Sequence, residues 1–288
     1  MAVVTYHPVA SVDFGDFTTA FNHAYRDYYV QIFMTTESFR ALMDRDDLSL
    51  ESSVVAVCDD RIVGMGLLGV RAATGWIGGL GVIPDYRRQG IGRQMMHYLL
   101  DCARDQDLAQ VKLEVIEVNE KAHALYRQLG FVDMRYLHYF TRDPAPISDL
   151  SHVYQIERHN PAALLGYFTA FHPVANPWQR DYPSLSKLAP HMRGWAVLDH
   201  DRNGDHDRVL GYALGWTDHH QIRISDIATH PNSQQALVGQ ALLTHLHRLY
   251  PDAHSLSINV AADDPVHAAY QALGYTTHLR QIEMSLTL

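Results

Sequence analysis

The sequence predicts an α/β protein made of two similar modules in tandem. Segments that alternate polar and apolar residues, as strands do, are interleaved with segments whose apolar residues recur at helical spacing. The order of these segments in the first half of the 288-residue chain returns in the second half. Pro84 and Pro231 end corresponding strands, and Tyr126 and Tyr270 lie in corresponding helices. A two-copy duplication therefore accounts for a length that suits two domains.

The elements of the first module follow from these patterns in chain order. A short strand at 3–7 precedes helices at about 12–29 and 36–43. A hairpin of strands 52–57 and 62–70 is followed by a glycine-rich strand at 76–83. The remaining elements are a helix at about 90–105, a strand at 111–118, a helix at 119–129 and a strand at 135–140. Asn119 is a good N-cap residue, and Gly130 suits the position after a helix.

The second module repeats this order after a linker. Residues 144–150 are rich in proline and in small or acidic residues, so we expect modules at 1–143 and 151–288. Counted from the two prolines, Gln234 matches Arg87, Leu237 matches Gly90 and Gly239 matches Gly92. A leucine side chain at 237 would obstruct a ligand that approaches the backbone there. We therefore expect a degenerate second copy with a structural or substrate-shaping role.

Composition excludes some classes of protein. With 47% hydrophobic and 19% charged residues, the chain resembles a soluble globular protein. A net charge of −9 argues against a nucleic-acid binder and is compatible with a cationic amine substrate. Cys58 and Cys102 fall in apolar settings and are expected to be buried free thiols. There is no secretory pattern at the start and no apolar stretch of membrane-spanning length, so we expect a cytoplasmic protein.

The segment from Trp76 to Gly92 carries the main binding signal. A strand ends at Pro84, and a helix follows a loop that contains Gly90 and Gly92. Glycines allow the backbone to approach a ligand closely, and the free N–H groups and positive dipole of a helix start attract phosphate. The segment is neither a Walker loop nor a dinucleotide-binding motif. The candidate cofactor-binding residues here are Leu80, Gly81, Val82, Arg87, Arg88, Gln89, Gly90, Ile91, Gly92 and Arg93.

This segment resembles the acetyl-CoA pyrophosphate loop of the GNAT superfamily of N-acetyltransferases, through Arg87-x-x-Gly90-x-Gly92 after Leu80-Gly81-Val82. Residues 113–131 are similar to the later GNAT motif, especially that of the ribosomal-protein N-terminal acetyltransferases. The tandem layout resembles that of mycothiol synthases. The resemblance implies two modules, each a mixed, mostly antiparallel sheet flanked by helices, with a parallel strand pair splayed at the cofactor. It also implies acetyl-CoA as co-substrate.

Acyl transfer to an amine needs a base, an acid and a donor to the carbonyl oxygen. In the acetyltransferases that residues 113–131 resemble, the glutamate and tyrosine matching Glu114 and Tyr126 are base and acid. The alternatives are a solvent-facing glutamate and a tyrosine that only packs. A backbone N–H near Leu80–Val82 could bind the carbonyl oxygen. Tyr126 is also expected to contact the cofactor, and Asn119 to hydrogen-bond the pantetheine arm or the chain near it.

The acceptor and metal predictions are less specific. Tyr28, Tyr29 and Phe33 lie where the family usually binds its acceptor, although such aromatics could equally form the core face. The 19 histidines lack the spacing of a metal site, so no metal is expected. The loop 199–204 resembles the start of an EF-hand, but Leu210 replaces the glutamate at position twelve, so a polar hairpin tip is expected.

These observations lead to one functional hypothesis and one alternative. We expect the first module to acetylate a primary amine with acetyl-CoA. The alternative is a non-enzymatic CoA-binding or interaction module. The acceptor stays open among a polyamine, an aminoglycoside-like antibiotic, an amino-acid derivative and a protein N-terminus. No nucleic-acid or membrane partner is expected, and the sequence does not predict the oligomeric state.

Overall fold

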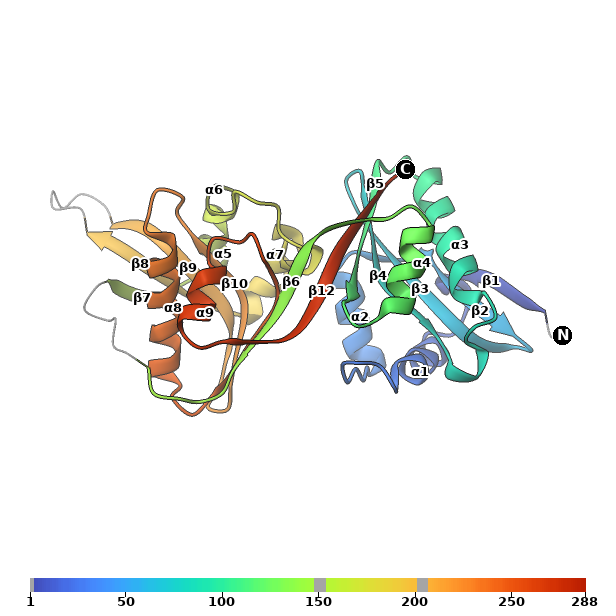
Figure 1. Ribbon diagram of the computed structural model, residues 1–288, viewed down its shortest axis with the longest axis horizontal. Helices are drawn as coiled ribbons and strands as arrows, with labels where there is room; N and C mark the ends of the chain where they lie inside the picture. Colours follow the sequence, from blue (N-terminus) through green and yellow to red (C-terminus); the bar gives the residue numbers. More distant parts are fainter. Residues whose placement is uncertain (1–2, 148–153, 201–206) are drawn as a thin grey trace. The chain divides into compact units, whose positions relative to one another are not determined.

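The computed structural model describes residues 3–147, 154–200 and 207–288. The chain forms two compact units, shown as a ribbon in Figure 1. Unit 1 comprises Met1–Met134 and Ile282–Leu288, and unit 2 comprises Arg135–Gln281. Most of the loop 199–204 and the end of the predicted linker 144–150 lie outside the described residues.

Unit 1 is a mixed sheet with helices on both faces. Its strands, in spatial order, are β1 (Val4–Pro8), β2 (Leu48–Cys58), β3 (Arg61–Arg71), β4 (Thr74–Val82), β5 (Gln110–Ile116) and the end of β12 (Thr276–Thr287). The pairs from β1 to β4 are antiparallel, whereas β4 and β5 are parallel. A Cβ atom at Gly66 would meet Leu99, and one at Gly81 would meet Tyr25. Because these glycines lie on opposite faces of the sheet, α3 (Ile91–Asp105) and α1 (Phe14–Tyr25) cover different faces (Figure 1).

Local sequence explains where most of these helices begin. Asp13 caps α1 through hydrogen bonds from the backbone of Gly15 and Asp16. Thr35 and Ser38 form a capping box at α2 (Thr36–Arg45), and Asn119 caps α4 (Glu120–Gln128). The predicted helix at 12–29 stops at Tyr25, because the chain then folds back and Asn22 hydrogen-bonds both backbone groups of Met34 at 2.8 Å. The short helices η1 (Val9–Ser11) and η2 (Pro84–Tyr86) precede α1 and α3.

Unit 2 repeats this architecture, as the sequence predicted. Its sheet runs β6 (Val132–Arg142), β11 (His254–Ala261), β10 (Gln221–Thr229), β9 (Asp207–Thr217), β8 (Arg193–His200) and β7 (Gln155–His159), with β10 and β11 parallel. Its α-helices are α5 (Pro161–Leu164), α6 (Phe168–Phe171), α7 (Tyr182–Leu188), α8 (Gln235–Leu249) and α9 (His267–Ala272). Short helices η3 (Leu165–Tyr167), η4 (Trp178–Arg180) and η5 (Ala189–His191) lie among them.

The two halves of the chain exchange their last strands. β6 ends the first half of the sequence but pairs with β11, in a register that runs from Ser255↔Arg142 to Ala261↔Leu137. The end of β12 lies instead beside β5, where the Leu288 N–H donates to the Ala109 carbonyl at 3.2 Å. The units therefore divide at other residues than the predicted boundary at 143, because each sheet is completed by the terminal strand of the other half.

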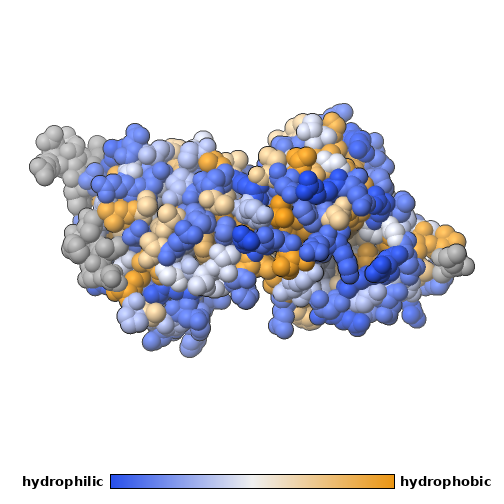
Figure 2. Space-filling model, viewed as in Figure 1, coloured by the Kyte–Doolittle hydropathy of each residue, from blue (hydrophilic) through white to orange (hydrophobic). Residues whose placement is uncertain are grey.

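The cores and surfaces follow the sequence pattern. In unit 1, Met95, Leu99 and Ala103 of α3 are buried in one cluster with the sheet. Cys58 is buried and Cys102 half-buried, and both are free. Hydrophilic residues predominate on the face shown in Figure 2. Within the described residues, no helix combines the length and apolar character needed to cross a membrane.

Candidate active site

The parallel strands of unit 1 separate halfway along their length. β4 and β5 pair from Thr74↔Gln110 to Ile77↔Leu113, and their pairing ends there. At the same point β4 carries a bulge, because Leu68 pairs with Ile77 and Leu67 with Gly79, which leaves Gly78 without an opposite residue. The rest of β4, up to Val82, thus has a β3 partner on one side and no β5 partner on the other. Along this segment the Leu80 backbone is hydrogen-bonded to Tyr25 and the Val82 carbonyl accepts from Arg87 Nε, whereas the rest of the open edge has no strand partner among the described residues.

The loop after β4 leads to an uncapped helix start. Gly90 has φ +81°, and an added Cβ would meet nothing within 4 Å. No side chain caps α3, and its first backbone bond runs from the Gln94 N–H to the Gly90 carbonyl. The N–H groups of Ile91, Gly92 and Arg93 therefore have no acceptor within the helix, and they lie at the positive end of a 15-residue helix. This geometry suits a phosphate or pyrophosphate.

Two arginines predicted to bind the cofactor have protein partners. Arg87 forms a bidentate pair with Asp27, at 2.8 and 2.7 Å, and also donates to the carbonyls of Val82 and Ala24. This hydrogen bonding holds the pKa of Asp27 below its ordinary value. Arg93 donates to the side chain of Gln128. Arg87 thus joins the end of α1 to the end of β4, which leaves the loop backbone as the main candidate for phosphate binding.

Glu114 lies on β5, next to the point where the strands separate. Its Oε2 accepts a hydrogen bond from Trp76 Nε1 at 2.7 Å, and its Oε1 is buried without a partner among the described residues. Burial raises the pKa of Glu114 to about 8, against the lowering effect of the Trp76 hydrogen bond. The alternative of a solvent-facing glutamate is therefore wrong. An unpartnered buried carboxyl oxygen is costly, which indicates a place for a polar ligand.

Tyr126 of α4 is buried, and its ring packs against Phe131 at 6.1 Å between centroids. Among the described residues its hydroxyl has no hydrogen-bond partner. Burial raises the pKa of Tyr126 well above its ordinary value, with Tyr28 contributing. The hydroxyl therefore keeps its proton at neutral pH and can donate it. Asn119 caps α4 by accepting from the Ala122 N–H at 3.3 Å.

Tyr25 is a site residue that the sequence analysis missed. A Cβ on Gly79 would lie 3.3 Å from the Tyr25 hydroxyl, and one on Gly81 would lie 2.9 Å from its ring. The ring therefore lies against β4, and glycines are needed beneath it. Burial raises the pKa of Tyr25, Tyr28 and Tyr126 raise it further, and a hydrogen bond with the Leu80 backbone lowers it. The glycine-rich run 78–81 was the available sequence signal.

The predicted acceptor residues differ in their setting. The Tyr28 ring lies edge-on to Tyr25 at 5.0 Å and to Tyr29 at 5.5 Å. Tyr29 is 55% exposed and Phe33 is 79% exposed, so these two are not core residues. The Tyr29 hydroxyl lies 3.5 Å from the Val118 carbonyl, at the end of β5. The loop after α1 therefore adjoins the chain just beyond β5, and Tyr28 contributes to the raised pKa of Tyr126.

The corresponding strands of unit 2 also separate, but a side chain fills the space. β10 and β11 pair from Gln221↔His254 to Ile224↔Ser257, and β10 has a bulge at Ser225. Beyond this point Arg180 donates to Asp226 Oδ1 of β10 at 3.3 Å, and to Ser257 Oγ and the Ile258 carbonyl of β11 at 3.1 Å each. The guanidinium group thus bridges the two strands where unit 1 is open.

The other counterparts in unit 2 are also committed to protein contacts. The Tyr270 hydroxyl is fully buried and donates to Ser257 Oγ at 3.0 Å.

The predicted alignment of the two loops was incorrect. The match of Leu237 to Gly90 is wrong, because α8 begins closer to Pro231 than α3 does to Pro84. The residue that precedes α8 is Gln234, with a φ of −76°. The match of Gly239 to Gly92 is wrong as well, since Gly239 lies inside α8 against Ala269.

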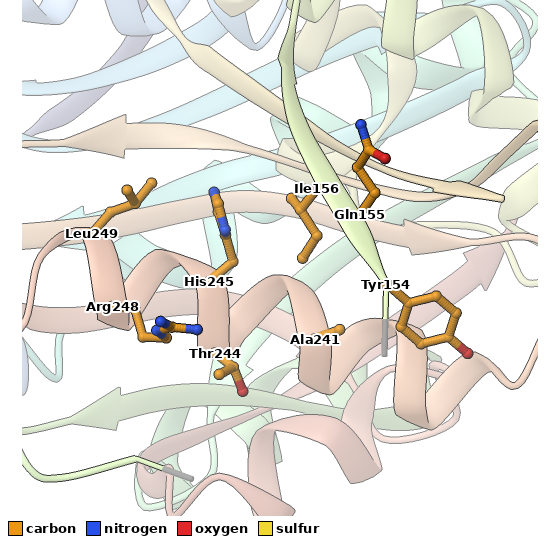
Figure 3. A pocket seen from close by; sticks show the side chains of 8 residues that line it. All are labelled: Tyr154, Gln155, Ile156, Ala241, Thr244, His245, Arg248 and Leu249. Atoms are coloured by element: carbon orange, nitrogen blue, oxygen red, sulfur yellow. The ribbon is translucent and has the colours of Figure 1, made fainter. Parts of the chain in front are cut away.

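A separate pocket lies in unit 2, away from the residues described above. It has a volume of about 440 Å³ and lies between the start of β7 and α8 (Figure 3). Its lining residues are Tyr154, Gln155, Ile156, Ala241, Thr244, His245, Arg248 and Leu249. In the part of the chain that the structure describes, no group of three or more His, Cys, Asp or Glu side chains is placed to hold a metal ion.

Comparisons with known proteins identify a family for both units of the chain. The sequence model of a family described as the acetyltransferase (GNAT) family matches residues 18–131 and 157–275. The [ribosomal protein bS18]-alanine N-acetyltransferase of Escherichia coli K12 is 44% identical over 52 residues, which are 18% of this chain and 35% of that protein. The N-alpha-acetyltransferase RimI of Mycobacterium tuberculosis is 48% identical over 52 residues, 18% of this chain and 31% of that protein.

The alignment is partial for these two relatives and nearly complete for one solved tandem protein. The chain aligns with only about a third of the length of the curated relatives it matches. The tandem GNAT protein from the clavulanic acid biosynthesis pathway aligns over 99% of this chain and 98% of its own, with a TM-score of 0.67 and 16% identity. At this identity the likeness shows the tandem fold alone.

Proposed function

Because this chain belongs to the acetyltransferase (GNAT) family, we propose that unit 1 transfers an acetyl group from acetyl-CoA to a primary amine. The observation that carries the proposal is the pair of unpartnered groups beside the separating strands. Glu114 Oε1 and the Tyr126 hydroxyl both lack a partner among the described residues, and they come from different elements. One is a proton acceptor when ionised, and the other is a proton donor.

The residues divide the binding of acetyl-CoA between them. The backbone N–H groups of Ile91, Gly92 and Arg93 are suited to the pyrophosphate, and the open side of β4 to the pantetheine arm. A backbone N–H of the segment Leu80–Val82 would hold the thioester oxygen as negative charge develops on it. Glycine fits position 90 for two reasons. It adopts a φ of +81° without steric cost, and it places no side chain in the open space beside the loop.

The proposed chemistry balances its protons. Glu114 Oε1 takes a proton from the ammonium form of the acceptor, and the neutral amine nitrogen then forms a bond to the thioester carbonyl carbon. The tetrahedral species collapses, the carbon–sulfur bond breaks, and Tyr126 gives its proton to the departing thiolate. The nitrogen gives its second proton to the Tyr126 phenolate, and Glu114 releases the first proton to solvent, so both residues return to their starting states. With a pKa of about 8, Glu114 is a stronger base than an ordinary carboxylate.

The test is release of CoA thiol from acetyl-CoA in the presence of an amine panel. The panel contains a polyamine, an aminoglycoside, an amino-acid amide and a peptide with an N-terminal alanine, the last because one relative is named for acetylating such an alanine. The proposal expects thiol release with at least one amine and its loss in Tyr126→Phe. Binding of acetyl-CoA without thiol release for any amine would favour the non-enzymatic alternative.

A further inference from the structure

The exchanged strand brings a second glutamate to the side of β5 that carries Glu114. Ser285 Oγ of β12 lies 3.4 Å from Gln110 Oε1, and the Leu288 N–H bonds the Ala109 carbonyl. Residue numbers decrease along β12 in the direction in which they increase along β5, so the two strands are antiparallel here. Since alternate residues of a strand share a face, Glu283 lies on the same face as Ser285, and Glu114 lies on the same face as Gln110.

Burial supports this assignment of faces. Ile282 and Met284 belong to the buried cluster formed with α3, on the other face of the sheet. Glu283 lies between these two residues, so strand alternation places it on the opposite face, the one that carries Trp76 and Glu114, where it is only 4% exposed. Counting back from the Ser285–Gln110 contact places Glu283 beside Lys112 and Glu114 on the neighbouring strand.

We propose that Glu283 is a positioning residue for the reaction, a buried acidic side chain that acts on Glu114 from the exchanged strand and makes it a stronger proton acceptor. Two carboxyl groups held close together in a buried place resist ionising together. Three charged groups act on Glu114 besides the Trp76 hydrogen bond: Glu283 and Asp46 favour its protonated form, and Lys112 opposes them. Asp46 is paired with Arg45, which offsets part of its charge.

This inference rests on the proposed role of Glu114 as base, and it gives the second half of the chain a part in that role. A residue near the C-terminus of the sequence lies beside a residue of the first half, within unit 1. The strand exchange is what places it there.

The test measures the titration of Glu114 directly and needs no substrate. Carbon-13 NMR of glutamate side-chain carboxyl carbons follows each group, and the Glu114 signal is the one that Glu114→Gln removes. Glu283→Gln should lower the apparent pKa of Glu114 by about one unit, the size expected for a neighbouring like charge. Ser285→Ala, on the same strand and face, is the matched control and should leave it unchanged. An unchanged Glu114 titration in Glu283→Gln overturns the inference.

Two further arms keep the result interpretable. If Glu283→Gln does not fold, Glu283→Asp keeps the charge but withdraws it by one methylene, and a smaller lowering is expected; no change again overturns the inference. The pH dependence of thiol release should move to lower pH in Glu283→Gln while the KM for acetyl-CoA stays constant. A shifted NMR titration in a protein that releases no thiol with any amine supports the carboxyl pair and overturns the proposed function.

Discussion

Trp76 donates a hydrogen bond of 2.7 Å from Nε1 to Glu114 Oε2, and this contact leaves the other carboxyl oxygen, Oε1, available to a ligand. The indole comes from β4 and the carboxyl from β5, so the bond spans the two strands next to the point where they separate. Oε1 is thereby left buried without a partner among the described residues. The indole stabilises an ionised carboxylate that burial otherwise disfavours, and the pKa of about 8 is the outcome.

The first prediction concerns the pH dependence of turnover. Glu114 with a pKa of about 8 is mostly protonated at pH 7, so kcat/KM should rise with pH and level off above about 8. Glu114→Gln should reduce the rate by about 10²- to 10⁴-fold, the usual contribution of a general base, and remove this ascending limb. A wild-type profile that is already flat from pH 6 to 9 would exclude Glu114 as the base.

The second prediction is that Glu114 makes the stability of the protein depend on pH. Its folded pKa lies above the ordinary value of 4.5, so between about pH 4.5 and 8 the folded chain holds a proton that the unfolded chain releases. Stability therefore falls as pH rises through this window, and the loss is complete above pH 8. Glu114→Gln removes the effect, so the Tm of the variant minus that of the wild type should grow from pH 5 to pH 8 and then stay constant. A difference independent of pH would contradict the raised pKa.

A third prediction concerns the proton donor. Tyr126→Phe keeps the buried ring against Phe131 and removes only the unpartnered hydroxyl. The kcat should fall by about 10²- to 10⁴-fold with little change in acetyl-CoA affinity or Tm. Tyr25→Phe is the informative comparison, because it removes a neighbouring hydroxyl that has no assigned part in the chemistry. Wild-type turnover in Tyr126→Phe would mean that Tyr126 only packs or that water protonates the thiolate.

The fourth prediction tests the loop after β4 with a matched pair of glycines. Gly90 and Gly274 have φ of +81° and +77°, and a Cβ at either meets nothing within 4 Å. Alanine at either position should therefore cost a similar amount, about 1–2 kcal/mol of backbone strain. Only Gly90→Ala should abolish acetyl-CoA binding in a calorimetric titration, because only Gly90 precedes α3. Equal binding by the two variants would refute the phosphate site.

The sequence predicted those features that depend on neighbours along the chain. The strand, loop and helix at 76–105, the later strand and helix, and the duplication each follow from periodicity, prolines and glycines. The end of the first helix was misplaced by four residues, because Asn22 binds the backbone of Met34 and only tertiary structure reveals that contact. The exchange of β6 and β12 was not predictable either, since an alternating strand pattern does not identify the strand it pairs with.

Some residues of the site could likewise be predicted from the sequence, and others could not. Glu114 and Tyr126 carried a sequence signal. The hydrogen bond from Trp76 to Glu114 Oε2 and the packing of Tyr25 over Gly79 and Gly81 are contacts between different elements, which local spacing does not reveal. Arg180 gave no signal, because its role depends on partners 46 and 77 positions away along the chain, Asp226 and Ser257. Contacts of this kind come from packing and are not encoded in local spacing.

The fifth prediction concerns the number of acetyl-CoA molecules per chain. Arg180 occupies the space between β10 and β11, and the Tyr270 hydroxyl is bonded to Ser257, so we expect binding in unit 1 alone and a stoichiometry of one. Tyr270→Phe should retain full turnover. Arg180→Ala removes the bridge and leaves the buried Asp226 with only His172 and Tyr212 as side-chain partners among the described residues, which should cost about 1–3 kcal/mol of stability. Millimolar methylguanidinium should restore part of the lost Tm, whereas sodium chloride at equal concentration should not. Arg180→Ala combined with Asp226→Ala should not respond to methylguanidinium, because the anionic partner is gone. A stoichiometry of two, or loss of turnover in Tyr270→Phe while Tyr126→Phe stays active, would transfer the active site to unit 2.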